Sequence, residues 1–184
     1  MASESKEERL LQALLGNSPL RHWHFQELLK ETGMSRGALN KWLKKYSKEG
    51  LLKRIKTPGR FPYFTAGEDN PAYKAKKKQY ILDRIYESGL ITELLDSDSI
   101  QVAIIFGSAA RGDWYKDSDI DLFILGDSKG MKKSRYETRL KRDIEVHEFS
   151  SRKEIKEVKT GLMSNIVNGY LIKGKLSDIA EVVA

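Results

Sequence analysis

Two short segments of the chain carry residues suited to binding a phosphate group and a divalent cation. Gly107 and Ser108 follow one apolar run, and Asp119 and Asp121 stand at the start of another. Carboxylates two positions apart on a strand project from the same face, where they repel each other unless a cation lies between them. Mg²⁺ fits such a pair, because it is a hard ion that takes carboxylate and phosphate oxygens. The spacing therefore predicts a nucleoside triphosphate and its metal at this place.

The elements around these residues are expected to hold them in position. The unbroken apolar run 102–106 predicts a strand that is covered on both faces. Gly107 lets the backbone turn sharply, and Ser108 begins a helix whose free N–H groups and positive dipole end favour a phosphate. In the second run, Ile120 and Leu122 alternate with the acids and are expected in the core.

The order of these residues resembles the signature of the DNA polymerase beta-type nucleotidyltransferases, and most of all that of their small prokaryotic members, the minimal nucleotidyltransferases. The resemblance rests on Gly107-Ser108, Ala110-Arg111-Gly112 and Ser118-Asp119-Ile120-Asp121-Leu122. It implies an α/β nucleotidyltransferase domain with a small mixed sheet over residues 100–184. The family also implies a third acid on a neighbouring strand.

The third acid is expected in the segment that ends at Phe149, where Asp143, Glu145 and His147 alternate with apolar residues. Register places Asp143 and Glu145 on one face, so either reaches the first two acids. We favour Glu145, because residues 149–151 look like the strand exit and helix cap that follow the third acid in similar proteins. Asp143 is the alternative, and His147 is interpreted as a half-buried strand residue.

The resemblance implies Mg²⁺-dependent transfer of a nucleoside monophosphate from a nucleoside triphosphate to a hydroxyl acceptor. Two Mg²⁺ ions are expected, and Glu145 either completes the second metal site or takes the proton of the attacking hydroxyl. Arg111 offsets charge on the pyrophosphate that leaves. In toxin–antitoxin pairs such enzymes modify a partner protein, which is the acceptor expected here. The expected catalytic and metal-binding residues are Asp119, Asp121 and Glu145, and the expected nucleotide-binding residues are Gly107, Ser108, Arg111 and Ser118.

The first third of the chain predicts a second, mainly helical domain with a β-hairpin. Amphipathic helices are expected over 7–15 and 24–32, followed by a third that Ser35 caps and then a hairpin of strands 51–56 and 61–65. Pro62 indicates an edge strand. This order looks like a winged helix-turn-helix, as in many prokaryotic transcription regulators.

The charge of this region favours binding to double-stranded DNA. The chain carries a net charge of +7, and residues 34–60 hold nine basic side chains against one acid, Glu49. The third helix is expected in the major groove, and a homodimer is expected because DNA-binding winged helices often work as dimers. The alternative is a winged helix that only mediates protein contacts. The expected base-edge contacts are Ser35, Arg36, Asn40 and Lys41, and the expected phosphate contacts are Lys44, Lys45 and Arg60.

The domain plan is therefore a winged helix over residues 1–68, a helical linker over 69–99 that breaks near Gly89, and the nucleotidyltransferase domain over 100–184. Apolar residues at helical spacing between Leu162 and Ile172 predict a last helix. The alternative to an enzyme is a transcription regulator whose transferase-like domain only binds or senses a nucleotide. Cysteine is absent, which excludes a disulfide and a thiol nucleophile, and no apolar run is long enough for a membrane span, so a cytoplasmic protein is expected.

Overall fold

The computed structural model of the chain describes residues 5–179, so the outermost residues of the predicted ranges 1–68 and 100–184 lie outside the described part. The chain divides into two units, Met1–Lys77 and Lys78–Ala184, and helix α4 (Pro71–Ser88) spans the boundary between them. Each unit is described by itself. None of the helices in the described range is both long enough and apolar enough to cross a membrane.

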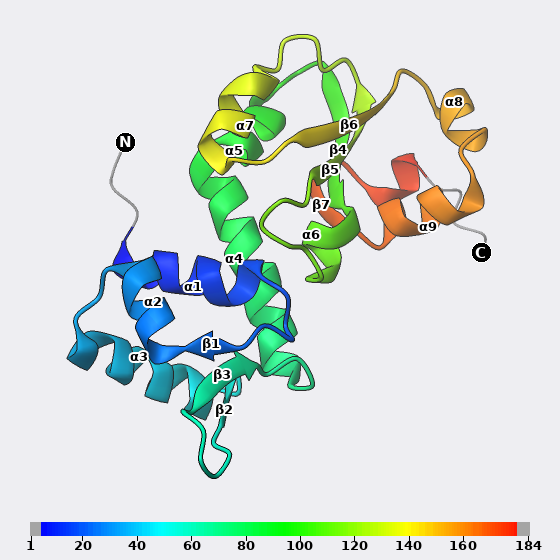
Figure 1. Cartoon of the computed structure of the whole chain (residues 1–184). Coiled ribbons are helices and arrows are strands. Elements are labelled where there is room, and N and C mark those ends of the chain that lie inside the picture. Colours follow the sequence, from blue (N-terminus) through cyan, green and yellow to red (C-terminus); the bar gives the residue numbers. More distant parts are fainter. Residues whose placement is uncertain (1–4, 180–184) are drawn as a thin grey trace. The chain divides into compact units, whose positions relative to one another are not determined.

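The N-terminal unit contains three helices and three short strands (Figure 1). Ser35 caps the third helix as predicted, because its hydroxyl accepts the N–H of Ala38 at 3.3 Å. Gly33 ends the helix before it in the left-handed conformation, with φ of 62°. In chain order the elements are α1 (Lys6–Gly16), β1 (Trp23–His24), α2 (Phe25–Thr32), α3 (Arg36–Lys48), β2 (Leu52–Ile55) and β3 (Tyr63–Ala66).

The three strands form an antiparallel sheet in the order β1-β3-β2, so β3 is central. The expectation that Pro62 marks an edge strand is therefore wrong. Strand β1 consists of Trp23 and His24 and is too short to recognise by alternation. It pairs with Phe64 and Tyr63 along the edge of β3 that was expected to have no partner strand. Pro62 lies one residue before β3, where its missing N–H removes no bond from the ladder.

The core of this unit forms around the apolar stripe of α3. Leu39, Leu43 and Tyr46 are at most 1% exposed, and the hydroxyl of Tyr46 donates to Glu7 of α1 at 3.0 Å. Full burial of one such side chain contributes about 1.5–3 kcal/mol. The opposite face of α3 is exposed. The helix is thus held from one side and presents its polar side to solvent.

The C-terminal unit is an α/β structure. Gly89, with φ of 88°, separates α4 from the next helix, where a break was predicted. The elements that follow are α5 (Leu90–Asp96), β4 (Ile100–Phe106), α6 (Gly107–Arg111), β5 (Ile120–Gly126), α7 (Lys133–Leu140), β6 (Ile144–Phe149), α8 (Arg152–Lys156), α9 (Thr160–Val167), β7 (Tyr170–Lys173) and a 3₁₀ turn (Leu176–Asp178).

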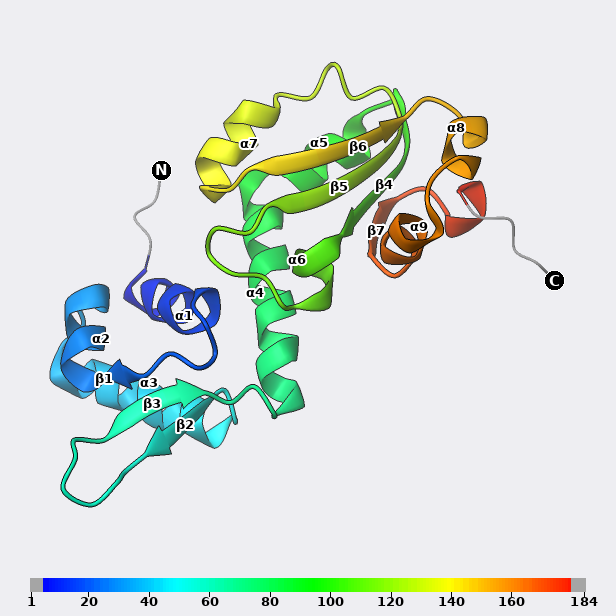
Figure 2. The same ribbon diagram turned by 45° about the vertical axis from the view of Figure 1, so that its right-hand side comes forward.

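The sheet is mixed, as predicted, with strand order β6-β5-β4-β7 (Figure 2). Strand β4 runs antiparallel to β5 and β7, whereas β5 and β6 are parallel and are joined through α7. Helices α5 and α7 lie on one side of the sheet and α8 and α9 on the other (Figure 1). Ile155 of α8 and Ile166 of α9 pack with Phe123 in one buried cluster. Both faces are thus covered, which explains why the central strands are apolar apart from Gln101 on β4 and Asp121 on β5.

The predicted last helix over 162–172 is wrong in its second half. Helix α9 ends at Val167, and the chain then forms the edge strand β7. At Gly169 a Cβ atom would lie 2.6 Å from both a methyl group of Ile104 and the carbonyl oxygen of Ile105. Glycine therefore permits the close backbone approach that turns the chain into the sheet. Apolar spacing in so short a segment does not distinguish a helix from a turn and a strand.

Candidate active site

One end of the sheet brings together residues from three strands. Phe106, the last residue of β4, is opposite Asp121 on β5, and Asp121 is beside Glu145 on β6. The parallel pairing of β5 and β6 sets this last neighbour, because a shift of one residue would turn Glu145 to the other face. The structure thus places Asp121 and Glu145 in adjacent positions on one face of the sheet.

Asp121, Glu145 and His147 form a group whose metal-binding atoms all lie within 4.8 Å of one another. Within this group, Nε2 of His147 is 3.4 Å from Oε1 of Glu145. Among the residues that the structure describes, Asp119 is not a member of this group, and its side chain is exposed one residue before β5. Asp143 is also exposed, and its carbonyl oxygen accepts the N–H of Ile120 at 2.9 Å.

The electrostatic environment of Asp121 shows how closely the charges gather. Burial raises the pKa of the Asp121 carboxyl, and the negative charge of Glu145 raises it further, as does that of Asp119. His147 and Arg111 act in the opposite direction and lower it. Partial burial among like charges is a cost that a bound cation would remove, so the site has the electrostatics of a cation site.

Gly107 is required by the packing of Asp121. Its φ is +66°, a conformation that side chains rarely adopt, and a Cβ atom at this position would lie 1.9 Å from Oδ2 of Asp121. Ser108 follows in the first turn of α6 and is half-buried. Helix α6 has only five residues and ends at Gly112, whose N–H donates to the carbonyl oxygen of Ser108 at 2.9 Å.

The two other residues expected at the nucleotide have partners of their own. Nε of Arg111 donates to Oδ2 of Asp113 at 3.0 Å, and the Arg111 side chain is half exposed. The hydroxyl of Ser118 accepts the N–H of Tyr115 at 2.8 Å, which closes the turn before β5. Ser118 thus stabilises the loop that leads to Asp119, a contact the sequence did not predict.

Arg142 supports the same loop from the segment between α7 and β6. Its Nη1 donates to the carbonyl oxygens of Tyr115 at 2.5 Å and Ser118 at 2.8 Å. The guanidinium also lies 4.8 Å from the ring centre of Trp114, a side chain that is 1% exposed. Burial lowers the pKa of Arg142 from its ordinary value. Sequence reasoning missed this residue, because nothing in its local pattern distinguishes it from a solvated arginine.

His147 is the second residue that sequence reasoning did not assign to the site. It is half-buried, as interpreted, but it also belongs to the group with Asp121 and Glu145. The available signal was its spacing of two residues from Glu145, which places both side chains on one face of β6. The sequence shows that Glu145 and His147 alternate with apolar residues. It does not show that this face of β6 lies beside Asp121 on β5.

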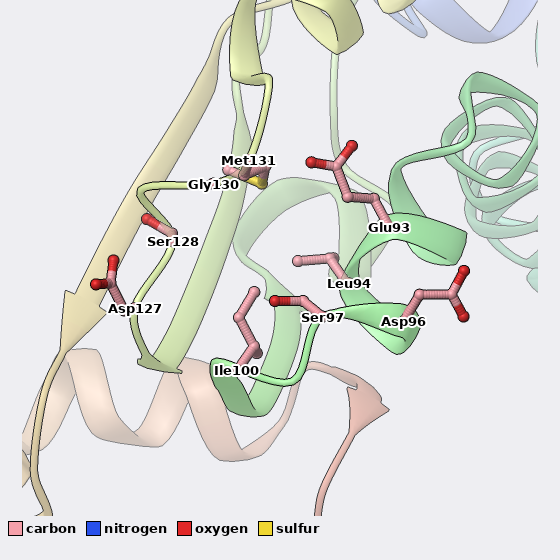
Figure 3. Close-up of a pocket in the computed structure, with 9 residues that line it drawn as sticks. All are labelled: Glu93, Leu94, Asp96, Ser97, Ile100, Asp127, Ser128, Gly130 and Met131. Carbon is pink, nitrogen blue, oxygen red and sulfur yellow. The ribbon is translucent and has the colours of Figure 1, made fainter.

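A pocket of about 330 Å³ lies at the other end of the sheet (Figure 3). It is lined in part by Ile100 at the start of β4 and by Asp127 just after β5, whereas Asp121 lies at the opposite end of these strands. The Glu93 carboxylate in this pocket accepts the N–H of Lys132 at 3.1 Å and the hydroxyl of Tyr136. This pocket is separate from the carboxylate cluster.

The residues expected at DNA are all exposed in the N-terminal unit. Six of them lie on α3 or cap it, and Arg60 lies in the turn between β2 and β3. Lys45 also has contacts within the unit: its Nζ lies 4.5 Å from the ring centre of Trp42 and 4.0 Å from a carboxylate oxygen of Glu49. The six residues at α3 are Ser35, Arg36, Asn40, Lys41, Lys44 and Lys45.

Comparison with known proteins identifies the C-terminal part of the chain. Residues 90–177 match the family described as polymerase beta, nucleotidyltransferase. No curated protein sequence matches. A solved structure titled "Crystal structure of the toxin-antitoxin with AMP-PNP" is similar at 17% identity with a TM-score of 0.35, over 55% of this chain and 77% of that chain. This match supports a nucleotidyltransferase domain of the polymerase beta type in residues 90–177, and with it an enzyme that transfers phosphorus-containing groups.

Proposed function

We propose that the C-terminal unit transfers a nucleoside monophosphate from a nucleoside triphosphate to a hydroxyl group of a partner protein. The observation that carries the proposal is the pairing of Asp121 with Glu145 beside Gly107, inside the segment that matches the nucleotidyltransferase family. Paired carboxylates meet the need of the reaction for a metal site, and the glycine turn lets the Asp121 carboxylate lie against the backbone at the start of α6.

The side chains at the sheet end suit a divalent cation. Asp121 and Glu145 offer carboxylate oxygens, and Asp119 contributes negative charge to the same place. Asp119, Asp121 and Glu145 would hold two Mg²⁺ ions, as expected from the sequence. When bound, such ions neutralise the triphosphate and lower the pKa of the acceptor hydroxyl.

The remaining residues of the motif are assigned to the nucleotide. Gly107 would face a phosphate through its backbone, since the Asp121 carboxylate occupies the space beside its Cα, and the Ser108 hydroxyl would donate to a phosphate oxygen. Arg111 is near enough to lower the pKa of Asp121, so its charge also reaches the place where pyrophosphate would leave. Ser118 is proposed at the nucleotide as well, through its support of the loop before Asp119.

The reaction is a substitution at the α-phosphorus. The acceptor oxygen forms a bond to this phosphorus, and the bond from the phosphorus to the oxygen that bridges to the β-phosphate breaks. Pyrophosphate leaves with the electron pair of that bond. The hydroxyl proton passes to solvent, and the exposed carboxylate of Glu145 takes it first only where this carboxylate does not complete the second metal site.

Transfer of radiolabel from the α-phosphate tests the proposal. Each of the four ribonucleoside triphosphates is incubated with Mg²⁺ and the protein, alone and with cell extract, and labelled bands are compared with those of an Asp119→Ala/Asp121→Ala variant. Label that appears only with the intact acids is the expected result, and the labelled band identifies the acceptor. Absence of label, with nucleotide still bound, would replace this function by nucleotide sensing in a transcription regulator.

For the N-terminal unit we propose a winged helix that binds double-stranded DNA. The element order from α1 to β3, with the sheet order β1-β3-β2, supports it. The exposed polar face of α3 supplies side chains for the major groove, and the turn that carries Arg60 forms the wing. Affinity for duplex DNA should fall steeply as salt rises, because the phosphate contacts release counterions. Affinity that is independent of salt would contradict these contacts.

A further inference from the structure

His147 lies in the row next to the two acids. On β6 it follows Glu145 by two residues, and on β5 its neighbour is Phe123, which follows Asp121 by two residues. The acids occupy the outer row at the sheet end, and Phe123, at 0% exposed, belongs to the buried cluster under α8 and α9. His147 therefore stands at the border between the carboxylates and the core.

The packing of His147 orients its ring toward the acids. The ring centre lies 5.2 Å from that of Phe106, and 23% of the side chain is exposed. Nε2 lies 3.4 Å from Oε1 of Glu145, and one ring nitrogen of His147 lies within 4.8 Å of the ligand atoms of both Asp121 and Glu145. Ligands about 2.1 Å from one ion lie roughly 3–4 Å apart, so the His147–Glu145 distance already suits a shared ion, and a small side-chain movement would bring Asp121 to the same ion.

A nitrogen ligand changes which ion is preferred. Mg²⁺ takes oxygen ligands and keeps much of its water, whereas imidazole is a ligand of the first-row transition metals. Mn²⁺ binds carboxylate oxygens and can replace Mg²⁺ in most phosphate chemistry. As a first-row transition metal it also binds imidazole. A site with two carboxylates and one imidazole should thus discriminate between these two ions.

We propose that Asp121, Glu145 and His147 form a three-ligand site that binds Mn²⁺ in preference to Mg²⁺. The proposal rests on the proposed function in one respect, because the ion bound here would serve nucleotidyl transfer. Two Mg²⁺ ions are expected from the sequence. The proposal replaces the Mg²⁺ ion nearest to Glu145 by Mn²⁺. Binding of the ion is measured without any transfer, so the two proposals fail separately.

The experiment is a titration of the full chain with Mn²⁺, followed by electron paramagnetic resonance, in which the free ion gives a sharp six-line signal. Mg²⁺ is then added as a competitor. Electron spin echo modulation from imidazole ¹⁴N reports directly whether a histidine nitrogen is bound to Mn²⁺. The variants are His147→Phe, which keeps an aromatic ring beside Phe106, and His147→Gln, which keeps a polar group. The matched control is His22→Phe, at an exposed histidine that stacks on Tyr63 at 4.1 Å.

The unaltered chain should bind Mn²⁺ at least about tenfold more tightly than Mg²⁺ and show the nitrogen modulation. Both His147 variants should lose the modulation and most of the preference but still bind Mg²⁺, and His22→Phe should behave like the unaltered chain. Equal affinity for the two ions, with no modulation, would overturn the proposal and leave the transferase assignment intact. Binding of neither ion would also overturn this proposal, and the transfer assay would then decide the proposed function separately.

Discussion

The carboxylate of Asp121 lies against the backbone of Gly107 so closely that a Cβ atom at position 107 would be 1.9 Å from Oδ2. Gly107 of the first motif and Asp121 of the second motif are thus in direct contact. Phe106 and Asp121 are opposite each other in the β4–β5 ladder, which brings the residue after Phe106 beside this carboxylate. The spacing of the two motifs in the sequence reflects this antiparallel pairing.

Gly107→Ala should abolish nucleotidyl transfer, because the new methyl group displaces the Asp121 carboxylate. The positive φ of 66° adds about 1–2 kcal/mol of destabilisation. Transfer assays and thermal unfolding measure the two effects. The control is Gly161→Ala in α9, where a Cβ atom has no neighbour within 4 Å and φ is not positive. Loss of transfer in the control, or full transfer in Gly107→Ala, would show that this contact is not required.

Asp121→Asn should change how stability depends on pH. The pKa of Asp121 is higher in the folded state than in the unfolded state, where it is about 4. At pH values between these two pKa values, the folded state therefore binds more protons than the unfolded state. The free energy of unfolding therefore increases as pH falls through that interval. At pH values above the interval Asp121 is ionised, and its repulsion with Glu145 and Asp119 destabilises the folded state. In a chelator, the unfolding free energy of the native chain relative to Asp121→Asn should thus decline from low to neutral pH. A difference that is constant with pH would mean that Asp121 is not perturbed.

Glu145→Gln should remove most transfer activity, whereas Asp143→Asn should keep it. Glu145 is the strand neighbour of Asp121 and joins the ligand group, while Asp143 is exposed and lies before β6. Single-turnover rates of the two variants, which differ only in position along one segment, decide between the two acids. The opposite result would make Asp143 the third carboxylate.

Arg142→Lys should lower both stability and transfer. A lysine cannot span the carbonyl oxygens of Tyr115 and Ser118 in the geometry of a guanidinium, and loss of a hydrogen bond at such partly exposed acceptors costs about 1 kcal/mol. The loop before Asp119 should become mobile, which hydrogen exchange at residues 115–119 would detect. Arg135→Lys, on the exposed side of α7, is the control and should leave exchange in this loop unchanged.

Lys44→Gln should weaken binding to duplex DNA about equally for all sequences. Loss of one phosphate contact should reduce the slope of log affinity against log salt by about 0.9. Fluorescence anisotropy at several salt concentrations gives this slope. Lys30→Gln, an exposed lysine on α2, removes the same charge from outside the proposed set. An equal change of slope in both variants would point to a diffuse charge effect rather than a contact at Lys44.

Local features of the structure were readable from the sequence because short-range physics produces them. Ser35 caps α3 through its own side chain, and Gly89 separates two helices through its own backbone freedom. The apolar run 102–106 of β4 predicted a strand that is covered on both faces, and the sheet has helices on both sides (Figure 1). The mixed sheet was expected only from the resemblance to a family.

Errors arose where two segments distant in the sequence meet. The strand β1 has two residues and exists because Tyr63 and Phe64 pair with it, which also moves β3 to the centre of its sheet. The strand β7 forms because Gly169 lets the chain approach Ile104 and Ile105, although its apolar spacing indicated a helix. No local pattern contains these partners.

The sequence by itself determined the residue types of the site and the two-residue spacing that places Glu145 with His147 on one face of a strand, whereas Asp119, expected on the same strand as Asp121, lies one residue before β5. It left Asp143 and Glu145 as alternatives. Only the tertiary structure decided which strands are neighbours and in what register, and so which acid stands beside Asp121 and that His147 joins the pair. The physical reason is that periodicity fixes the face of a side chain, whereas its neighbours across the sheet depend on hydrogen bonds between segments that only the folded chain brings together.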